Sequence, residues 1–179
     1  MRPGVVVLVG LPGAGKSALA AGLAARLHGA RVLDKDLVRD SLFAPCDYTA
    51  AERDVSFSAM LDAARYHLGR ARVVIFDGLT FSRRSQVAAA ESVALDAGGF
   101  AAVVVCDVPV EVAIERCEAD ARRSSHLGAN RDADLVRRVA AEMVEPAGSY
   151  LTLDMTGDLA NRVGEALAYV EDCAAAVSP

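Results

Sequence analysis

The sequence is poor in lysine and in aromatic residues, and it has no long apolar run. Only 5% of its residues are aromatic, whereas 53% are hydrophobic, so the core must be built mainly from Val, Leu and Ala. No stretch approaches the roughly 18 apolar residues that a membrane span requires, and we therefore expect no membrane partner. Lys16 and Lys35 are the only lysines among 19 cationic residues, and arginine suits bidentate contacts with phosphate.

A positive charge excess is also missing. Asp and Glu number 24 against 19 Lys and Arg, which gives a formal net charge of −5. No overall positive field is therefore present to attract a polyanion. The composition disfavours nucleic acid as a partner, although it leaves room for a local basic groove.

Cysteines at metal or redox spacing are absent as well. The four cysteines form no C-x-x-C pair, and two of them fall at apolar positions of expected elements, which indicates reduced buried thiols and a cytoplasmic protein. We see no repeats, linkers or low-complexity blocks. The 179 residues are therefore expected to form a single domain, 1–179, as a monomer or a homodimer.

One motif organises the rest of the chain. It fits the phosphate-binding pattern G-x-x-x-x-G-K-[ST], a P-loop. Its glycines allow main-chain N–H groups to converge on phosphate oxygens, its lysine would reach the β- and γ-phosphates, and its serine would bind Mg²⁺. We therefore expect ATP and Mg²⁺ as ligands. The motif consists of Gly10, Leu11, Pro12, Gly13, Ala14, Gly15, Lys16 and Ser17.

The context of this motif supports the prediction. Residues 4–9 form an apolar run that predicts a buried strand, and Leu19, Leu23 and Leu27 recur at helical spacing directly after the loop. Strand and helix patterns alternate along the chain, which predicts a parallel α/β sheet covered by helices on both faces. Five strands are expected, at 4–9, 31–34, 72–77, 100–106 and 150–155.

Carboxylates follow two of these strands. Asp34 and Asp36 stand at the end of strand 31–34, and Asp77 closes strand 72–77. Ligands of open α/β sheets bind outside the carboxyl ends of the strands, so Asp77 is placed to hold a Mg²⁺-bound water or to order the site. Asp36 has two interpretations at this stage: it faces the ligand, or it caps the helix expected at 37–43.

Several arginines flank the same crevice. Arg39 shares a helix face with Asp36. Arg53 lies in the first turns of a helix opened by a capping box, where a cation opposes the macrodipole; either an anionic ligand or solvent accounts for it. Arg83 and Arg84 open the next helix, and one of the two is expected to be only solvated.

A further group of arginines lies on the helix that follows Asp107-Val108-Pro109. Arg116 and Arg123 share one face, with Arg122 beside them. The polar stretch 124–130 that follows predicts a mobile lid, spanning about 116–131 with the end of this helix. On an isolated helix, such arginines would instead form a surface ion-pair face.

In this order, the parts resemble the kinase branch of the P-loop superfamily. The chain resembles the polynucleotide 5′-kinase domain through the P-loop, Asp36-Leu37-Val38-Arg39, Asp77 and Arg116 after D-V-P. It is similar to adenylylsulfate kinase through the segment 33–39, with Lys35 where that family has glycine. Zeta-toxin-like kinases, antibiotic-phosphorylating kinases and AAA-type ATP-binding proteins share the layout. The resemblance covers nearly the whole chain and implies a P-loop kinase fold with a helical lid.

The resemblance also implies roles for single residues. Asp36 would be the general base that takes the proton of an attacking hydroxyl, and Arg39 would bind an anionic group of the acceptor. Arg53 would match an acceptor-binding arginine, with Asp34, Asp77 and Arg83 beside the acceptor. Arg116, with Arg122 or Arg123, would bridge the γ-phosphate and stabilise the transition state together with Lys16.

Three functions follow from these observations. The first is an ATP- and Mg²⁺-dependent kinase that phosphorylates a hydroxyl of a small molecule. The second is a polynucleotide 5′-hydroxyl kinase, which would require Arg39, Arg53, Arg83 and Arg84 to converge in one groove. The third is a nucleotide-binding regulatory switch, for which no acceptor base such as Asp36 would be needed.

Overall fold

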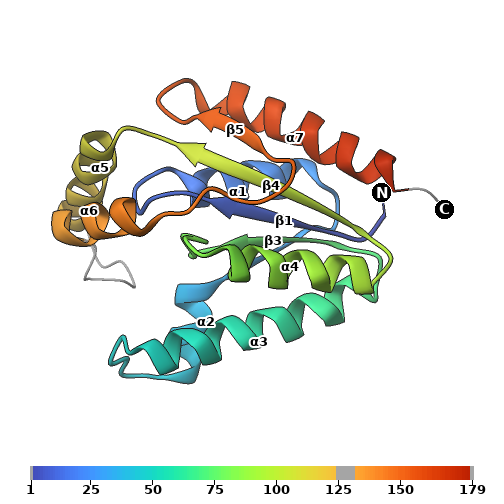
Figure 1. Ribbon diagram of the computed structural model, residues 1–179, viewed down its shortest axis with the longest axis horizontal. Helices are drawn as coiled ribbons and strands as arrows, with labels where there is room; N and C mark the ends of the chain where they lie inside the picture. Colours follow the sequence, from blue (N-terminus) through green and yellow to red (C-terminus); the bar gives the residue numbers. More distant parts are fainter. Residues whose placement is uncertain (1, 124–131, 178–179) are drawn as a thin grey trace.

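A computed structural model describes residues 2–123 and 132–177 of the chain. The stretch 124–130, for which the sequence predicts a lid, lies outside the described residues. The described part is a five-stranded sheet with helices packed around it (Figure 1).

The sheet is wholly parallel, as the alternation of strand and helix patterns predicts. Its strand order is β2-β3-β1-β4-β5. Every residue of the two strands β1 and β3 is buried, which explains their continuous apolar sequences. The strands are β1 (Gly4–Val9), β2 (Arg31–Asp34), β3 (Val73–Asp77), β4 (Phe100–Asp107) and β5 (Leu151–Asp154). All five were expected, with bounds that differ by no more than one residue.

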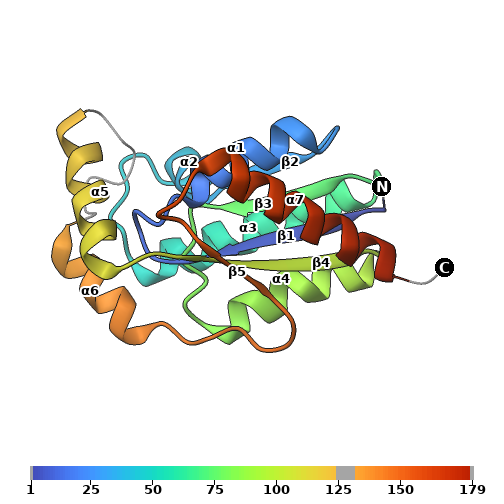
Figure 2. The ribbon, with the colours of Figure 1, turned by 90° about the horizontal axis from the view of Figure 1, so that it is seen from above.

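Helices cover both faces of the sheet, so the predicted layering is confirmed (Figures 1 and 2). The helices α1 and α7 pack on one face and α3 and α4 on the other, each with its own apolar cluster. The helices α5 and α6 lie beyond the carboxyl ends of the strands (Figure 1). The helices are α1 (Lys16–Arg26), α2 (Lys35–Leu42), α3 (Ala50–Leu68), α4 (Arg84–Asp96), α5 (Val110–Arg123), α6 (Ala133–Glu142) and α7 (Leu159–Ala176).

The helix expected at 37–43 begins earlier, at Lys35. The reason is its N-cap, which is Asp34: Oδ1 of Asp34 accepts hydrogen bonds from the amides of Asp36 and Leu37 at 2.8 and 3.3 Å. Asp36 therefore lies inside the helix, and the capping interpretation of Asp36 is wrong.

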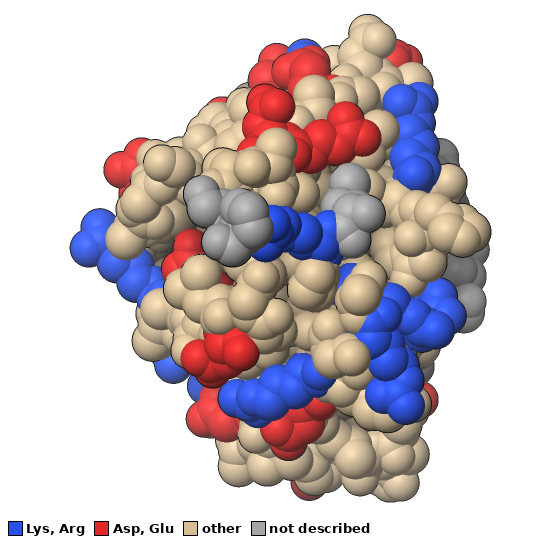
Figure 3. Space-filling model, turned by 90° about the vertical axis from the view of Figure 1, so that its right-hand side faces the viewer, with Lys and Arg blue, Asp and Glu red and all other residues tan. Residues whose placement is uncertain are grey.

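Because all strands are parallel, one end of the molecule holds their carboxyl ends and the other end holds their amino ends. The carboxyl ends of all five strands face α5 and α6, whereas their amino ends lie at the opposite end, which Figure 3 views directly. Among the helices of the described residues, none is long and apolar enough to cross a membrane.

The contact between α1 and α7 gives a stability prediction. A Cβ on Gly22 would collide with the side chain of Val163, which is buried. Gly22→Ala should therefore lower the free energy of unfolding by about 1 to 3 kcal/mol, because overpacking outweighs the gain of helix propensity. Urea unfolding measures the change.

Gly164 in α7 is the matched control. A Cβ there would meet nothing within 4 Å, so Gly164→Ala should raise the free energy of unfolding by up to about 1 kcal/mol. Equal effects of the two substitutions would contradict the described packing of α1 on α7.

Candidate active site

The P-loop connects β1 to α1 and presents its main chain to a large cavity. Gly13 and Gly15 have φ of 79° and 89°, a region that side chains rarely adopt. A Cβ on Gly13 would also collide with the carbonyl of Ala113 in α5. Glycine at these positions thus shapes the loop and lets α5 pack directly against it.

The first turn of α1 is arranged to receive an anion. Its N-cap, Gly15, provides no side-chain hydrogen bond, and no residue of the first turn is acidic. The amides at this helix end therefore point towards the cavity side of the loop without a capping side chain among the described residues. Such a helix N-terminus, with its partial positive charge, binds phosphate.

Lys16 is held against the loop itself. Its side-chain amine donates to the carbonyls of Gly10 and Leu11 at 2.8 and 2.6 Å, and only 7% of the residue is exposed. The ammonium group therefore has a defined position beside the loop amides. Two oxygen acceptors hold it there while it lines the cavity.

Ser17 and Asp77 meet beside the loop because β1 and β3 are neighbours in the sheet. The Ser17 hydroxyl donates to Oδ1 of Asp77 at 3.1 Å. Burial raises the pKa of Asp77, although hydrogen bonds from Gly78 and Ser17 and the charge of Lys16 oppose this rise. A buried carboxylate beside a hydroxyl suits a hard cation, which Mg²⁺ is. The described residues contain no group of three or more His, Cys, Asp or Glu that could hold a metal ion, so Mg²⁺ would have to complete its shell with phosphates and water.

Asp36 faces the P-loop across the same cavity. Its Oδ1 lies 2.9 Å from Nη2 of Arg39 and 3.2 Å from Nζ of Lys35. The side chains of Asp36 and Arg39 are almost fully buried, at 8% and 10% exposure. The guanidinium of Arg39 also lies over the ring of Tyr48, 4.4 Å from its centroid. The carboxylate is thereby fixed in one orientation.

Arg116 approaches the loop from α5. Its Nη2 donates to the carbonyl of Met155 at 2.9 Å, which ties α5 to the segment after β5. Its Nη1 lies 3.9 Å from the position that a Cβ of Gly15 would occupy. This cation therefore stands directly beside the phosphate-binding loop.

The cavity has a volume of about 960 Å³ and brings most of the predicted site residues together. Residues of seven separate segments of the chain share its walls: 12–18, 35–39, 48–53, 77–86, 116–120, 135–142 and 155–159. Those predicted from the sequence are Pro12, Gly13, Gly15, Lys16, Ser17, Asp36, Arg39, Arg53, Asp77, Arg83 and Arg116.

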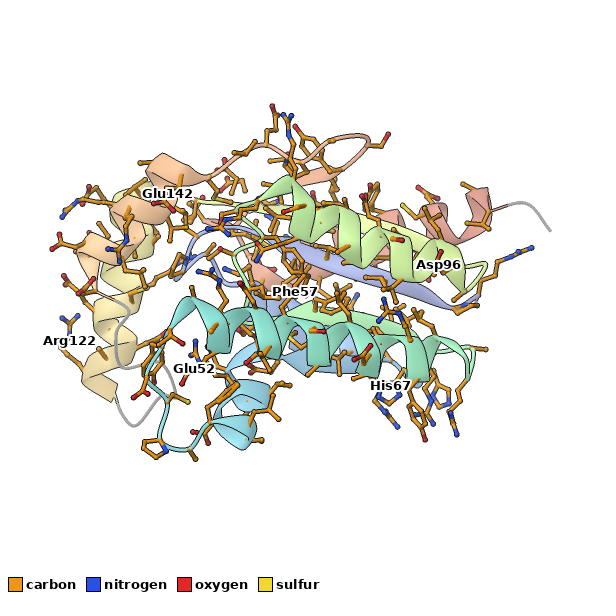
Figure 4. The ribbon with its side chains drawn as sticks, turned by 60° about the horizontal axis from the view of Figure 1, so that its bottom comes forward. Glu52, Phe57, His67, Asp96, Arg122 and Glu142 are labelled. Atoms are coloured by element: carbon orange, nitrogen blue, oxygen red, sulfur yellow. The ribbon has the colours of Figure 1, made fainter. Side chains whose placement is uncertain are left out.

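Other predicted residues lie outside the cavity lining. Gly10 and Ala14 are buried, and Asp34 serves as the cap of α2. Arg122 lies on the exposed face of α5, where its Nη1 is 3.7 Å from Glu118 (Figure 4). The side chain of Arg123, the last residue of α5, is not among the described parts of the structure. The roles of Arg122 and Arg123 remain predictions.

Sequence reasoning missed several residues of the cavity. Arg138 and Glu142 reach it from α6, Gln86 from α4, and Tyr48 from the loop before α3. No sequence signal marks Arg138 or Glu142, because they lie beside the apolar stripe that defines the helix. Lys35 could have been found, since it stands directly between the two carboxylates Asp34 and Asp36.

Fold and site together define a P-loop protein with a five-stranded parallel sheet. The sequence matches the model of a family described as an AAA domain over residues 5–146. The chain belongs to this AAA domain family. A search of curated proteins finds no significant match.

Solved structures share the fold over nearly the whole chain. A gluconokinase from Sinorhizobium meliloti 1021 is 21% identical, with 98% of this chain and 96% of that chain covered and a TM-score of 0.71. The APS kinase CysC of Mycobacterium tuberculosis, solved with AMPPNP and APS, is 23% identical, with coverage of 95% and 98% and a TM-score of 0.69. Kti12 of Chaetomium thermophilum, solved with ADP-AlF3, is 19% identical, with coverage of 95% and 98% and a TM-score of 0.77.

The raised pKa of Asp77 yields a prediction for the protein without nucleotide. A buried acid with a raised pKa favours the folded state when protonated, and this contribution is lost as the pH rises through that pKa. Asp77→Asn should therefore raise the free energy of unfolding at neutral pH, since the amide keeps a hydrogen-bond acceptor for Ser17. The difference in the free energy of unfolding between the variant and the wild type should decrease as the pH falls, because Asp77 then becomes protonated. Thermal unfolding at several pH values measures this difference. If the variant were less stable than the wild type at neutral pH, burial of the Asp77 charge would not be destabilising, and the prediction would be wrong.

Proposed function

We propose that the protein is an ATP- and Mg²⁺-dependent kinase that transfers the γ-phosphate to a hydroxyl group of a small molecule. One observation carries this proposal: a fixed, buried carboxylate, Asp36, lines the same cavity as the P-loop lysine. A phosphate-binding loop alone would serve any nucleotide-binding protein. A positioned carboxylate across the cavity adds what phosphoryl transfer to an alcohol needs.

In this proposal, the loop amides and Lys16 hold the β- and γ-phosphates of ATP. Ser17 and Asp77 would hold Mg²⁺, which would neutralise charge on the phosphates. Asp36 accepts the proton of the acceptor hydroxyl, while the bond between this oxygen and the γ-phosphorus forms and the bond to the β,γ-bridging oxygen breaks. ADP and a phosphate ester are the products.

The arginines have separate roles in the proposal. Arg39 orients Asp36 through the 2.9 Å ion pair and offers its guanidinium to an anionic group of the acceptor. Arg53 and Arg83 line the same cavity and would contact the acceptor too. Arg116, beside Gly15, stabilises the charge that develops on the transferring phosphoryl group.

The polynucleotide 5′-kinase alternative has less support. Arg39, Arg53 and Arg83 share the cavity, but Arg84 does not line it. The side chain of Arg84 instead donates to the carbonyl of Glu145 at 3.1 Å. This distribution favours a bounded acceptor pocket over a basic channel that extends past the site.

Asp36→Asn tests the proposed base. Asparagine keeps the shape and an acceptor for Arg39 but cannot take a proton, so transfer should fall by roughly 10²- to 10⁴-fold while ATP affinity changes little. The acceptor is first identified by a thermal-shift screen of hydroxyl-bearing metabolites with MgATP, and transfer is then followed by phosphorus NMR. Asp40→Asn, an exposed residue of the same helix, is the control and should transfer normally.

Two outcomes would overturn the proposal. Near-normal transfer by Asp36→Asn would remove Asp36 as the base. Formation of ADP and free phosphate by the wild type, without any phosphorylated acceptor across the screen, would favour the regulatory switch.

Arg116→Ala should lower kcat by about 10²-fold or more and leave the affinity for ATP nearly unchanged, because the arginine acts on charge that develops during transfer. Arg123→Ala is expected to behave in the same way. Isothermal titration measures ATP affinity, and steady-state assays measure kcat. Arg137→Ala is the control, since Arg137 is an exposed cation of α6 paired with Glu111 and Asp134. If kcat of both Arg116→Ala and Arg123→Ala stayed within about threefold of the wild-type value, the catalytic role of these two arginines would be rejected.

A further inference from the structure

A second group of cations lies at the other end of the sheet from the P-loop. It consists of Arg31, Arg70 and Arg72, together with Tyr66 and His67, and we call it the far-edge cluster. Arg31 opens β2, Arg72 precedes β3, and the other three residues lie at or just after the end of α3. Amino ends of strands form this edge, whereas the candidate active site lies at their carboxyl ends.

Parallel pairing brings the cluster together. Arg31 is the register partner of Val74 in β3, so it points to the same face of the sheet as Val74. Arg72, two residues before Val74, points to that face as well. Val74 packs in the apolar cluster under α3. Both arginines therefore lie on the α3 side of the sheet, at its amino edge.

The turn after α3 adds the third arginine. The amides of Arg70 and Arg72 donate to the carbonyl of His67 at 3.0 and 3.3 Å, which folds the chain back over the helix end. The guanidinium of Arg70 lies 3.9 Å from the centre of the Tyr66 ring. Figure 4 shows nitrogen-bearing side chains gathered beside the labelled His67, and Figure 3 shows several groups of Lys and Arg side chains on this end of the molecule, one of them at the lower right.

Within residues 2–123 and 132–177, none of the three arginines forms an ion pair with Asp or Glu. Arg65, one turn earlier on α3, differs because it pairs with Asp62 at 2.7 Å. Burial and the charges of Arg72, Arg31 and Arg70 lower the pKa of His67. Its Nδ1 is buried and has no hydrogen-bond partner among the described residues.

One cation near a helix C-terminus is explained by the helix dipole, but three unpaired arginines around one helix end repel one another. Arginine forks match phosphate oxygens in pairs, and the cluster contains no lysine. Tyr66, a residue that is 56% exposed, adds an aromatic ring, and exposed aromatic rings stack with unpaired bases. A group of arginines beside an exposed aromatic residue is therefore suited to bind the phosphates and a base of a single-stranded nucleic acid.

We propose that the far-edge cluster binds a short segment of single-stranded nucleic acid, with Arg31, Arg70 and Arg72 on backbone phosphates and Tyr66 against a base. An anionic membrane surface fits less well, because the cluster offers neither lysines nor an apolar face that could insert. An acidic peptide would satisfy the arginines but would leave Tyr66 without a stacking partner. The cluster is separate from the proposed kinase site, so this inference does not depend on that function.

Fluorescence anisotropy with a labelled oligouridylate of about twelve nucleotides tests the proposal, at about 50 mM salt where backbone contacts are strong. We expect saturable binding whose log Kd rises with log salt concentration with a slope of about 2, as three phosphate contacts to a single strand predict. Saturating MgATP should not displace the oligonucleotide. Displacement by MgATP, or the absence of saturable binding, would overturn the proposal.

Variants locate the site. Arg31→Ala with Arg70→Ala should weaken oligonucleotide binding at least about tenfold, and Tyr66→Ala about fivefold or more. Both keep the fold, since these side chains are exposed, and an unchanged affinity for ATP verifies this.

Arg65→Ala is the matched control and should bind as the wild type does, because Arg65 is already paired with Asp62. Equal loss in the Arg65 variant, or tighter binding of a polyglutamate peptide or of phosphatidylserine vesicles, would reject the single-stranded ligand.

Discussion

Parallel pairing of the strands is the constraint on which the candidate active site depends. Because every strand runs in the same direction, the carboxyl ends of β1, β2 and β3 meet at one edge of the sheet. This meeting places the P-loop next to Asp77, and the register puts Asp34 opposite Asp77. Asp36 follows Asp34 in the first turn of α2. Residues separated by tens of positions in the sequence thus share one cavity, and some of them, such as Ser17 and Asp77, are in direct contact there.

Burial of charge at this edge has a thermodynamic cost. Lys16, Asp36, Arg39 and Asp77 are all buried, and each loses hydration that its partners replace only in part. The pKa of Asp77 is raised by this loss, and Nε of Arg39 has no partner among the described residues. A charged ligand gains more binding free energy at such a buried site than at an exposed site, because electrostatic interactions are stronger where water is excluded.

The fold was predictable from sequence to a greater degree than the site. Continuous apolar runs located the central strands β1, β3 and β4 to within one residue, since buried parallel strands need such runs on both faces. Lys16, Ser17, Asp36 and Asp77, which the sequence analysis singles out, line one cavity, while their roles stay predictions. The sequence could not decide whether Asp36 faces the ligand or caps the helix, because Asp suits both roles; in the structure the cap is Asp34.

The sequence did not mark the cavity residues Arg138 and Glu142 because it does not show how a helix is oriented towards its neighbours. Arg138 and Arg122 are both polar positions on amphipathic helices, yet one lines the cavity and the other pairs with Glu118 on the surface. Periodicity shows which face of a helix is apolar, but it does not show what the flanks of that face will meet. That choice depends on how α5 and α6 pack together over the loop, which is a property of the tertiary structure.

The distribution of cations connects the two ends of the molecule. At a net charge of −5, the average field of the chain repels anions, and screening limits each charge to about 8 Å at physiological salt. Anion recognition must therefore come from local groups of cations without acidic neighbours. The cavity groups its cations around buried carboxylates that a reaction can use, whereas the far-edge cluster holds arginines with no ion-pair partner among the described residues and an exposed ring. The first arrangement is suited to chemistry on a phosphate, and the second is suited only to holding one.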